Sequence, residues 1–220
     1  MRGSAVRRPI KLRSLGIRFA VAGALVLWLA QLYGDQITRE FVPIVRAALN
    51  TVQDDFTVLS IDMAHENAST TMSVRADLAH PLYVANRVVY PLNSNPTTAG
   101  WMQVNITTGG VLQYLVMVAI VVLAWPAFSI LEYGSRVAIG GALGFLLAVS
   151  STVTTILAEL WFPLHDDLAP TEVWPLLVWS RFLMGGGGLA LALGLAAIAI
   201  SIAANVATRG ASSVRMQHYA

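Results

Sequence analysis

The chain has 220 residues, of which 56% are hydrophobic and only 12% are charged, and its mean hydropathy is +0.64. This composition excludes a disordered chain and a soluble nucleic-acid-binding domain, and it disfavours an ordinary water-soluble domain. There is no cysteine, which excludes disulfides, a thiolate nucleophile and cysteine metal sites. Charged residues are absent from four stretches, residues 19–34, 88–131, 137–158 and 182–208. The sequence therefore predicts up to four membrane crossings.

The first predicted span covers residues 19–34 and follows a basic tail, residues 1–18, that holds six of the fourteen Lys and Arg residues. A cleaved signal peptide is the alternative interpretation, because such peptides also join a basic segment to an apolar run. However, the run ends in Ala30-Gln31-Leu32-Tyr33-Gly34, which has no small-x-small cleavage pattern. We therefore expect an uncleaved transmembrane anchor.

Residues 110–207 predict a region of three further transmembrane helices, followed by a tail of residues 208–220. The second to fourth spans are expected at residues 110–132, 137–161 and 182–207. Pro126 is a point at which the second span kinks or ends. At about 1.5 Å per residue, the third and fourth spans are long enough for roughly 30 Å of hydrocarbon.

The distribution of basic residues predicts the orientation of these spans. Residues 1–18, 132–136 and 208–220 hold nine basic residues and one acid, whereas residues 34–110 and 159–181 hold five basic residues and eleven acids. Lys and Arg in short loops are retained on the cytoplasmic side. We therefore expect a multi-pass protein of the inner membrane with both termini in the cytoplasm.

Residues 35–109 predict an external segment that begins with a helix. Apolar residues recur at three- and four-residue intervals over residues 35–55, which indicates an amphipathic helix bent at Pro43. This helix is expected either to lie along the outer leaflet or to continue the first span.

The remainder of the external segment predicts a small antiparallel sheet of three or four strands. Polar and apolar residues alternate in residues 71–78 and 101–107, as in half-buried strands. Residues 56–61 and 83–90 are the expected partner strands. The covered face should carry Met72, Val74, Ala76 and Leu78. The predicted fold is thus a mainly α membrane protein with four transmembrane helices and a small external β-rich segment between the first and second.

Motifs for metal-dependent proteolysis, nucleotide binding and serine hydrolysis are absent from the sequence. The interiors of the predicted spans contain no His, Lys, Asp or Cys, which argues against an intramembrane hydrolase and against a proton-coupled transporter. A weak metal-site candidate is His165-Asp166-Asp167 in the second outer loop, and a solvated loop is the alternative. We expect no catalytic residues and no cofactor.

Small residues mark candidate packing faces on the third and fourth spans. They recur at four-residue spacing as Gly140, Gly144, Ala148 and Thr152 in the third span, and at spacings of three and four as Gly185, Gly188 and Ala192 at the start of the fourth. Small side chains let helix backbones approach closely in membranes. We expect these two spans to pack on each other, with a docking face for another membrane protein as the alternative.

Glu159 and Arg181 bracket the second outer loop, at the ends of the third and fourth spans. If the two helix ends meet at the interface, these residues are a candidate ion pair that is strengthened by the reduced dielectric. The alternative is that Arg181 reaches the lipid headgroups alone.

The order of elements carries a resemblance. A basic tail and one anchor precede an alternating strand, TMSVRADL at residues 71–78, and VNITTGGVLQY at residues 104–114 leads from a strand straight into a span. In this order the chain resembles the small accessory membrane proteins found with exosortases, the exosortase-H-associated type. The resemblance implies a bacterial inner-membrane protein that accompanies a protein-sorting enzyme and lacks its catalytic cysteine, and it carries over no functional residue.

The leading hypothesis is a non-catalytic accessory or scaffold subunit of a bacterial inner-membrane protein-sorting or envelope complex, with a periplasmic domain. Its expected partners are membrane lipids and another integral membrane protein, and no nucleic acid. One alternative is a transporter or lipid-handling subunit that uses the hydroxyl cluster of residues 150–155 as a polar lining. The other is a metal-dependent enzyme built on His165, Asp166 and Asp167.

Overall fold

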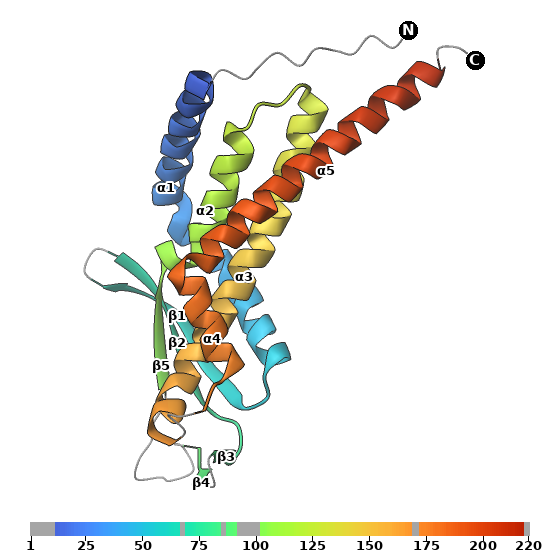
Figure 1. Cartoon of the computed structure of the whole chain (residues 1–220). Coiled ribbons are helices and arrows are strands. Elements are labelled where there is room, and N and C mark those ends of the chain that lie inside the picture. Colours follow the sequence, from blue (N-terminus) through green and yellow to red (C-terminus); the bar gives the residue numbers. More distant parts are fainter. Residues whose placement is uncertain (1–11, 67–68, 85–86, 92–101, 169–171, 218–220) are drawn as a thin grey trace.

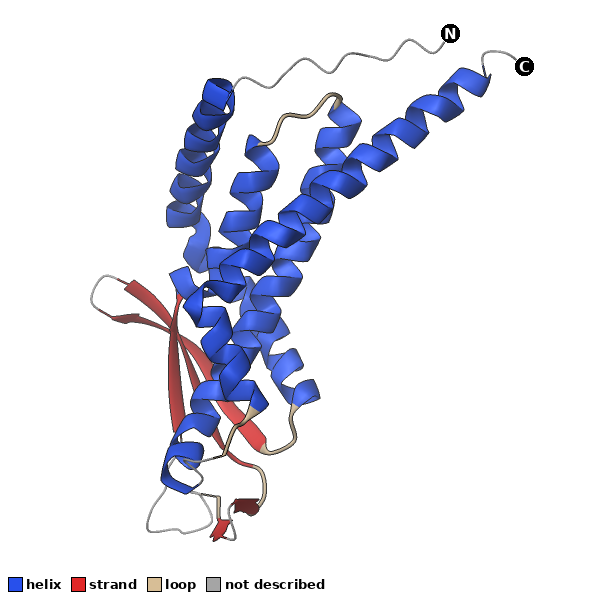
Figure 2. Cartoon of the chain, in the orientation of Figure 1, coloured by secondary structure: helices blue, strands red, loops and turns tan. Residues whose placement is uncertain are grey.

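The computed structural model describes residues 12–66, 69–84, 87–91, 102–168 and 172–217. Long helices lie side by side, and a small sheet crosses them towards the end opposite the two termini (Figure 1). Helices dominate the chain (Figure 2). In chain order the elements are α1 (Leu12–Val52), β1 (Phe56–Glu66), β2 (Ser69–Leu78), β3 (Leu82–Val84), β4 (Arg87–Val89), β5 (Met102–Thr107), α2 (Thr108–Ala124), α3 (Ile130–Leu168), α4 (Pro175–Phe182), a π-helical segment (Leu183–Gly187) and α5 (Gly188–Gln217).

Three helical stretches are long and apolar enough to cross a membrane. They are α1, α3 and the run that begins with α4 and continues through α5. Helix α2 is equally apolar but has only 17 residues, which corresponds to roughly 26 Å against the ~30 Å of a hydrocarbon core. The structure thus supports a multi-pass membrane protein with three candidate spans, and α2 is shorter than the span expected at residues 110–132.

Helix α1 continues the first predicted span into the predicted amphipathic helix as one helix of 41 residues. Pro43 lies inside it, although proline removes a backbone hydrogen bond and disfavours a helix interior. The second half of α1 is held by tertiary packing, because Phe41, Val45 and Leu49 are buried in the core that it shares with the sheet. The first half is largely uncovered, and only Ala22 and Val26 are buried before Gly34.

The boundary between α2 and α3 differs from the prediction. Helix α2 ends at Ala124 and is capped by Trp125, because the following residue, Pro126, cannot donate the next helical hydrogen bond. Helix α3 starts at Ile130, where the Ser129 hydroxyl accepts a hydrogen bond from the Glu132 amide at 3.1 Å. The inner loop expected at residues 132–136 is therefore wrong, since these residues form the first turns of α3.

The three-stranded sheet confirms most of the strand predictions. Strands β1, β2 and β5 pair antiparallel in the order β1-β2-β5, and Val74 lies opposite Ile61 and Val104. Trp101, the predicted start of the last strand, lies outside the described residues. The single strand expected at residues 83–90 is wrong. Strands β3 and β4 pair with each other, Val84 opposite Arg87, so the chain reverses within that segment.

One face of the sheet belongs to the main hydrophobic core. Met72, Val74 and Ala76 are completely buried, in one cluster with apolar residues of α1, α2 and α3, which confirms the predicted covered face. The opposite face is polar, and Ser73 and Asp77 on its central strand are also buried. This polar face consists of Thr57, Ser60, Asp62, Ser73, Arg75, Asp77, Gln103 and Asn105.

Candidate functional site

Helices α3 and α5 pack on each other as expected, but Gly140 and Gly144 of α3 lie against α2. A Cβ atom added to Gly140 would lie 2.7 Å from Val122 Cγ2, and one added to Gly144 would lie 3.2 Å from Leu115 Cδ1. Ala148 and Thr152, one and two turns further along the same row, are buried. On the side of α3 that meets α5, Ile139, Leu143 and Leu147 pack against the cluster that contains Ala192 and Ala196.

The small residues of α5 also meet α2. Ala192 and Ala196 are completely buried in one cluster with Tyr114 and Val118 of α2. A Cβ atom added to Gly188 would collide with the Tyr114 ring, whereas the corresponding position at Gly185 faces open space. Of the predicted packing residues, Gly188 therefore lies against Tyr114 of α2, Ala192 is buried in a cluster of α2, α3 and α5 side chains, and a Cβ atom added to Gly185 would meet nothing within 4 Å.

Three of the four consecutive glycines, residues 185–187, belong to the π-helical segment between α4 and α5, and Gly188 begins α5. Gly186 has a φ of +106°, a conformation that side-chain-bearing residues rarely adopt. The Leu183 carbonyl accepts a hydrogen bond from the Gly188 amide, and the Tyr114 hydroxyl donates a second one to it at 3.3 Å. Glycine is thus needed at position 186 for its backbone angle and at 188 for the close approach of Tyr114. Such π-helical segments frequently mark functional sites.

We expect Gly144→Leu to lower the free energy of unfolding by about 1–3 kcal/mol, because the added side chain would overpack the contact with Leu115 and Val118. Leu146→Ala is the control, since Leu146 is 63% exposed. Thermal unfolding of both variants in detergent, followed by circular dichroism, would measure the difference. Equal shifts in the two variants would show that Gly144 makes no such contact.

Part of the predicted hydroxyl cluster lines a small cavity beside the π-helical segment. The cavity has a volume of about 160 Å³. Its lining residues are Ile106, Gly110, Gln113, Tyr114, Ser151, Thr152, Thr155 and Met184. Thr152 is buried, and the Ser151 hydroxyl donates to the Ala148 carbonyl at 3.0 Å. The cavity offers hydroxyl and amide groups without a charged side chain among its described lining residues.

Among the described side chains, neither the candidate ion pair nor a group of metal ligands is formed. Glu159 and Arg181 are both exposed, and neither belongs to an ion pair among the described residues. His165 Nε2 lies 2.7 Å from the Glu172 carbonyl oxygen, and its ring stands edge-on to Trp174. The side chain of Asp167 lies outside the described part of the chain. Within that part, no three His, Asp or Glu side chains are grouped to hold a metal ion.

A buried ion pair that the sequence analysis missed closes the α2–α3 turn. Arg136 is only 1% exposed and pairs with Glu132, one helical turn away. Its Nη1 atom donates to the Trp125 carbonyl at 2.7 Å, and Glu132 Oε2 accepts from the Phe128 amide at 3.0 Å. Arg136 thus satisfies a carbonyl at the end of α2 that has no partner within the helix. The signal in the sequence is the i, i+4 spacing of the two charges just after Trp125-Pro126.

A second polar junction joins three elements that are distant in sequence. Asp35 of α1 accepts hydrogen bonds from the hydroxyls of Thr70 in β2, at 2.8 Å, and Thr108 in α2, at 3.4 Å. The Thr108 hydroxyl also lies 3.0 Å from the Thr70 carbonyl. The junction ties the sheet to two helices. Thr70 and Thr108 lie 35 and 73 residues from Asp35 along the chain, so no local sequence pattern predicts the junction.

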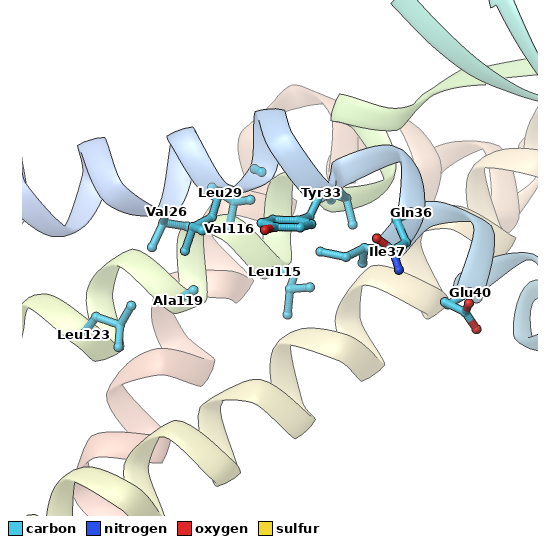
Figure 3. A pocket seen from close by; sticks show the side chains of 12 residues that line it. Val26, Leu29, Tyr33, Gln36, Ile37, Glu40, Leu115, Val116, Ala119 and Leu123 are labelled. Carbon is cyan, nitrogen blue, oxygen red and sulfur yellow. The ribbon is translucent and has the colours of Figure 1, made fainter.

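A larger groove lies between α1 and α2, with a volume of about 630 Å³ (Figure 3). Its lining residues are Val26, Leu29, Ala30, Tyr33, Gln36, Ile37 and Glu40 of α1 and Leu112, Leu115, Val116, Ala119 and Leu123 of α2. Side chains of both helices project into the space between them, with Glu40 at one end and Leu123 at the other (Figure 3). Leu123 also lines a hollow of about 440 Å³ that contains Arg18. The two cavities therefore adjoin at Leu123.

Comparisons with family models, curated proteins and solved structures give no match for this chain.

Proposed function

We propose that this chain is a non-catalytic accessory or scaffold subunit of a bacterial inner-membrane complex for protein sorting or envelope assembly. In this proposal both termini are cytoplasmic, α2 completes a fourth crossing and the sheet lies in the periplasm. The observation that carries the proposal is the two-sided sheet. One face shares a core with α1, α2 and α3, and the other face is polar.

The shared core holds the sheet at a fixed position relative to the membrane helices. A three-stranded sheet alone is only marginally stable in water, but this one rests on the buried side chains of α1 and α3. The Asp35–Thr70–Thr108 junction adds a polar link at the point where the sheet meets α1 and α2. The polar face is thereby presented at a set distance from the bilayer, as a scaffold for a second membrane protein requires.

The proposed partner contact is the polar face near Gln103 and Asn105. Both side chains are exposed, and Gln103 Nε2 donates to Asn105 Oδ1 at 3.0 Å. Amide and hydroxyl groups on a rigid surface suit a polar protein interface, in which specificity comes from hydrogen bonds more than from apolar area. We accordingly expect the partner to contact this polar face with a folded external surface and not with an apolar helix.

The test is the size of the complex in mildly solubilised native membranes. We expect the wild-type chain to migrate with a stoichiometric membrane-protein partner and Asn105→Arg to dissociate from it, while the thermal stability of the chain is unchanged. Asn50→Arg is the matched control, because Asn50 is exposed on α1 and does not belong to the polar face of the sheet. A wild-type chain that migrates alone, or identical behaviour of the two variants, would refute the proposal.

Transport is the second candidate function, and the hydroxyl-lined cavity beside the π-helical segment favours it. Helix interruptions that line a cavity are a recurrent feature of transporters. In the same experiment, a chain that migrates alone and gains thermal stability with a small polar solute would favour transport over the scaffold.

A further inference from the structure

We propose that the cleft between α1 and α2 binds one anionic phospholipid, with its phosphate at Arg18 and Ser129 and one acyl chain in the groove. The inference rests on the membrane location of the helices and not on the accessory role. It joins two cavities that share Leu123, the hollow that contains Arg18 and the apolar groove of Figure 3.

The hollow at the end of the cleft has the chemistry of a phosphate site. Arg18 is exposed, and it is the one charged side chain among the described residues that line the hollow. Ser129 lines it as well, and its oxygen already accepts a hydrogen bond from the Glu132 amide at 3.1 Å. The hydroxyl hydrogen of Ser129 is thereby left to donate to a phosphate oxygen. A guanidinium and a hydroxyl donor then face the same ligand.

The surroundings of the hollow fit the headgroup level of a bilayer. Its other lining residues include Trp125, Phe128 and Tyr133, which are exposed. Trp and Tyr are enriched at the membrane–water interface, where their rings contact the acyl chains and their polar atoms reach the headgroups. An arginine at this depth meets lipid phosphates, which are its ordinary partners near the end of a membrane helix.

The acid nearest to Ser129 does not compete with an anion. Glu132 is buried, and one of its carboxylate oxygens pairs with Arg136 while the other accepts from the Phe128 amide. Its negative charge is therefore compensated inside the protein. The guanidinium of Arg18 is available to a ligand, because no described acid forms an ion pair with it.

The groove supplies room for an acyl chain. Along α1 it extends from Val26 to Glu40, which is about 21 Å at the rise of an α-helix. The groove begins at Val26, about 12 Å along α1 from Arg18, and one leaflet contributes roughly 15 Å of hydrocarbon, so a chain anchored at Arg18 would enter the end of the groove at Val26 and Leu123. The end of the groove at Val26 and Leu123 is apolar, and its polar side chains, Tyr33, Gln36 and Glu40, extend from the middle to the opposite end (Figure 3).

A transmembrane helix of a partner is the other occupant that would fit an apolar groove, but the cation at its end favours a lipid. A helix would have to place an acid opposite Arg18, whereas every anionic phospholipid carries a phosphate at the headgroup level. Charge complementarity at Arg18, together with the adjoining apolar groove, therefore favours a lipid as the occupant.

The experiment is native mass spectrometry of the full chain in detergent with phosphatidylglycerol or phosphatidylethanolamine of equal chain length. We expect phosphatidylglycerol to bind more tightly than phosphatidylethanolamine, and we expect Arg18→Gln to weaken phosphatidylglycerol binding by about fivefold. Ala119→Trp should also weaken this binding, because its larger side chain would fill the groove. Arg13→Gln, at an exposed arginine outside the hollow, is the matched control and should bind as the wild type does. Circular dichroism would confirm that the lipid-free variants stay folded.

Two further arms identify the source of the phosphate and the occupant. Glycerol phosphate carries a phosphate but no acyl chain. It should not remain bound to the protein in the mass spectrum. A photo-crosslinking residue at Ala119, introduced in native membranes, should attach to lipid. Equal binding of the two lipids, equal effects of Arg18→Gln and Arg13→Gln, full binding of glycerol phosphate, or crosslinking of Ala119 to a polypeptide would each overturn the proposal.

Discussion

Arg136→Met is expected to lower the free energy of unfolding by about 3–5 kcal/mol, the usual cost of removing one partner of a buried ion pair. The substitution leaves the carboxylate of Glu132 in a site where that residue is only 5% exposed. It also removes the donor to the Trp125 carbonyl at the end of α2. Both losses act on the α2–α3 turn, so thermal unfolding in detergent should begin at a lower temperature.

The double variant Glu132→Gln with Arg136→Met separates the buried charge from the geometry. It should be more stable than Arg136→Met alone, because no uncompensated charge remains, even though the carbonyls of α2 still lack the arginine. Arg181→Met provides a surface control, since Arg181 is exposed, and should change the free energy of unfolding by less than about 0.5 kcal/mol. If Arg136→Met and Arg181→Met unfold at the same temperature, the buried pair does not exist.

Val74→Asp is expected to have the other large effect, a loss of more than about 4 kcal/mol. Val74 is completely buried in the central strand, between Ile61 of β1 and Val104 of β5. A carboxylate there would lie in the core that the sheet shares with α1 and α3, among apolar side chains that offer it no hydrogen bond. We expect little folded protein in membranes, measured as resistance to a protease added from the external side.

The neighbouring substitution Arg75→Asp tests the strand assignment directly. Arg75 is exposed on the polar face, because adjacent residues of a strand point to opposite faces. Its replacement should cost about 1 kcal/mol and leave most of the protein folded. Similar protease sensitivity of both variants would mean that Val74 and Arg75 do not lie on opposite faces of a half-buried strand.

Much of the candidate site could not be read from the sequence, because its contacts join distant segments. Small residues at Gly140 and Gly144 predict a close helix contact, but any neighbouring helix can satisfy that pattern, and only the packing assigns it to α2. Asp35, Thr70 and Thr108 show no shared local signal. The groove between α1 and α2 depends on where the largely uncovered half of α1 stands relative to α2.

Local periodicity determined what each segment does with its own side chains. The alternation in residues 71–78 was sufficient to assign Met72 and Val74 to a covered face, because side chains on a strand alternate with a period of two whatever the strand packs against. In the same way, the long apolar stretches indicated membrane helices, and Pro126 marked a kink or an end of the second span.

Tertiary structure decided the properties that depend on a neighbour. Helix α1 continues through Pro43 because Phe41 and Val45 are buried in the core shared with the sheet, and Glu132 and Arg136 join α3 because each compensates the other's charge inside the protein. A period of two or 3.6 specifies which side of an element avoids water, whereas the identity of the element that covers it depends on contacts between segments far apart in the chain.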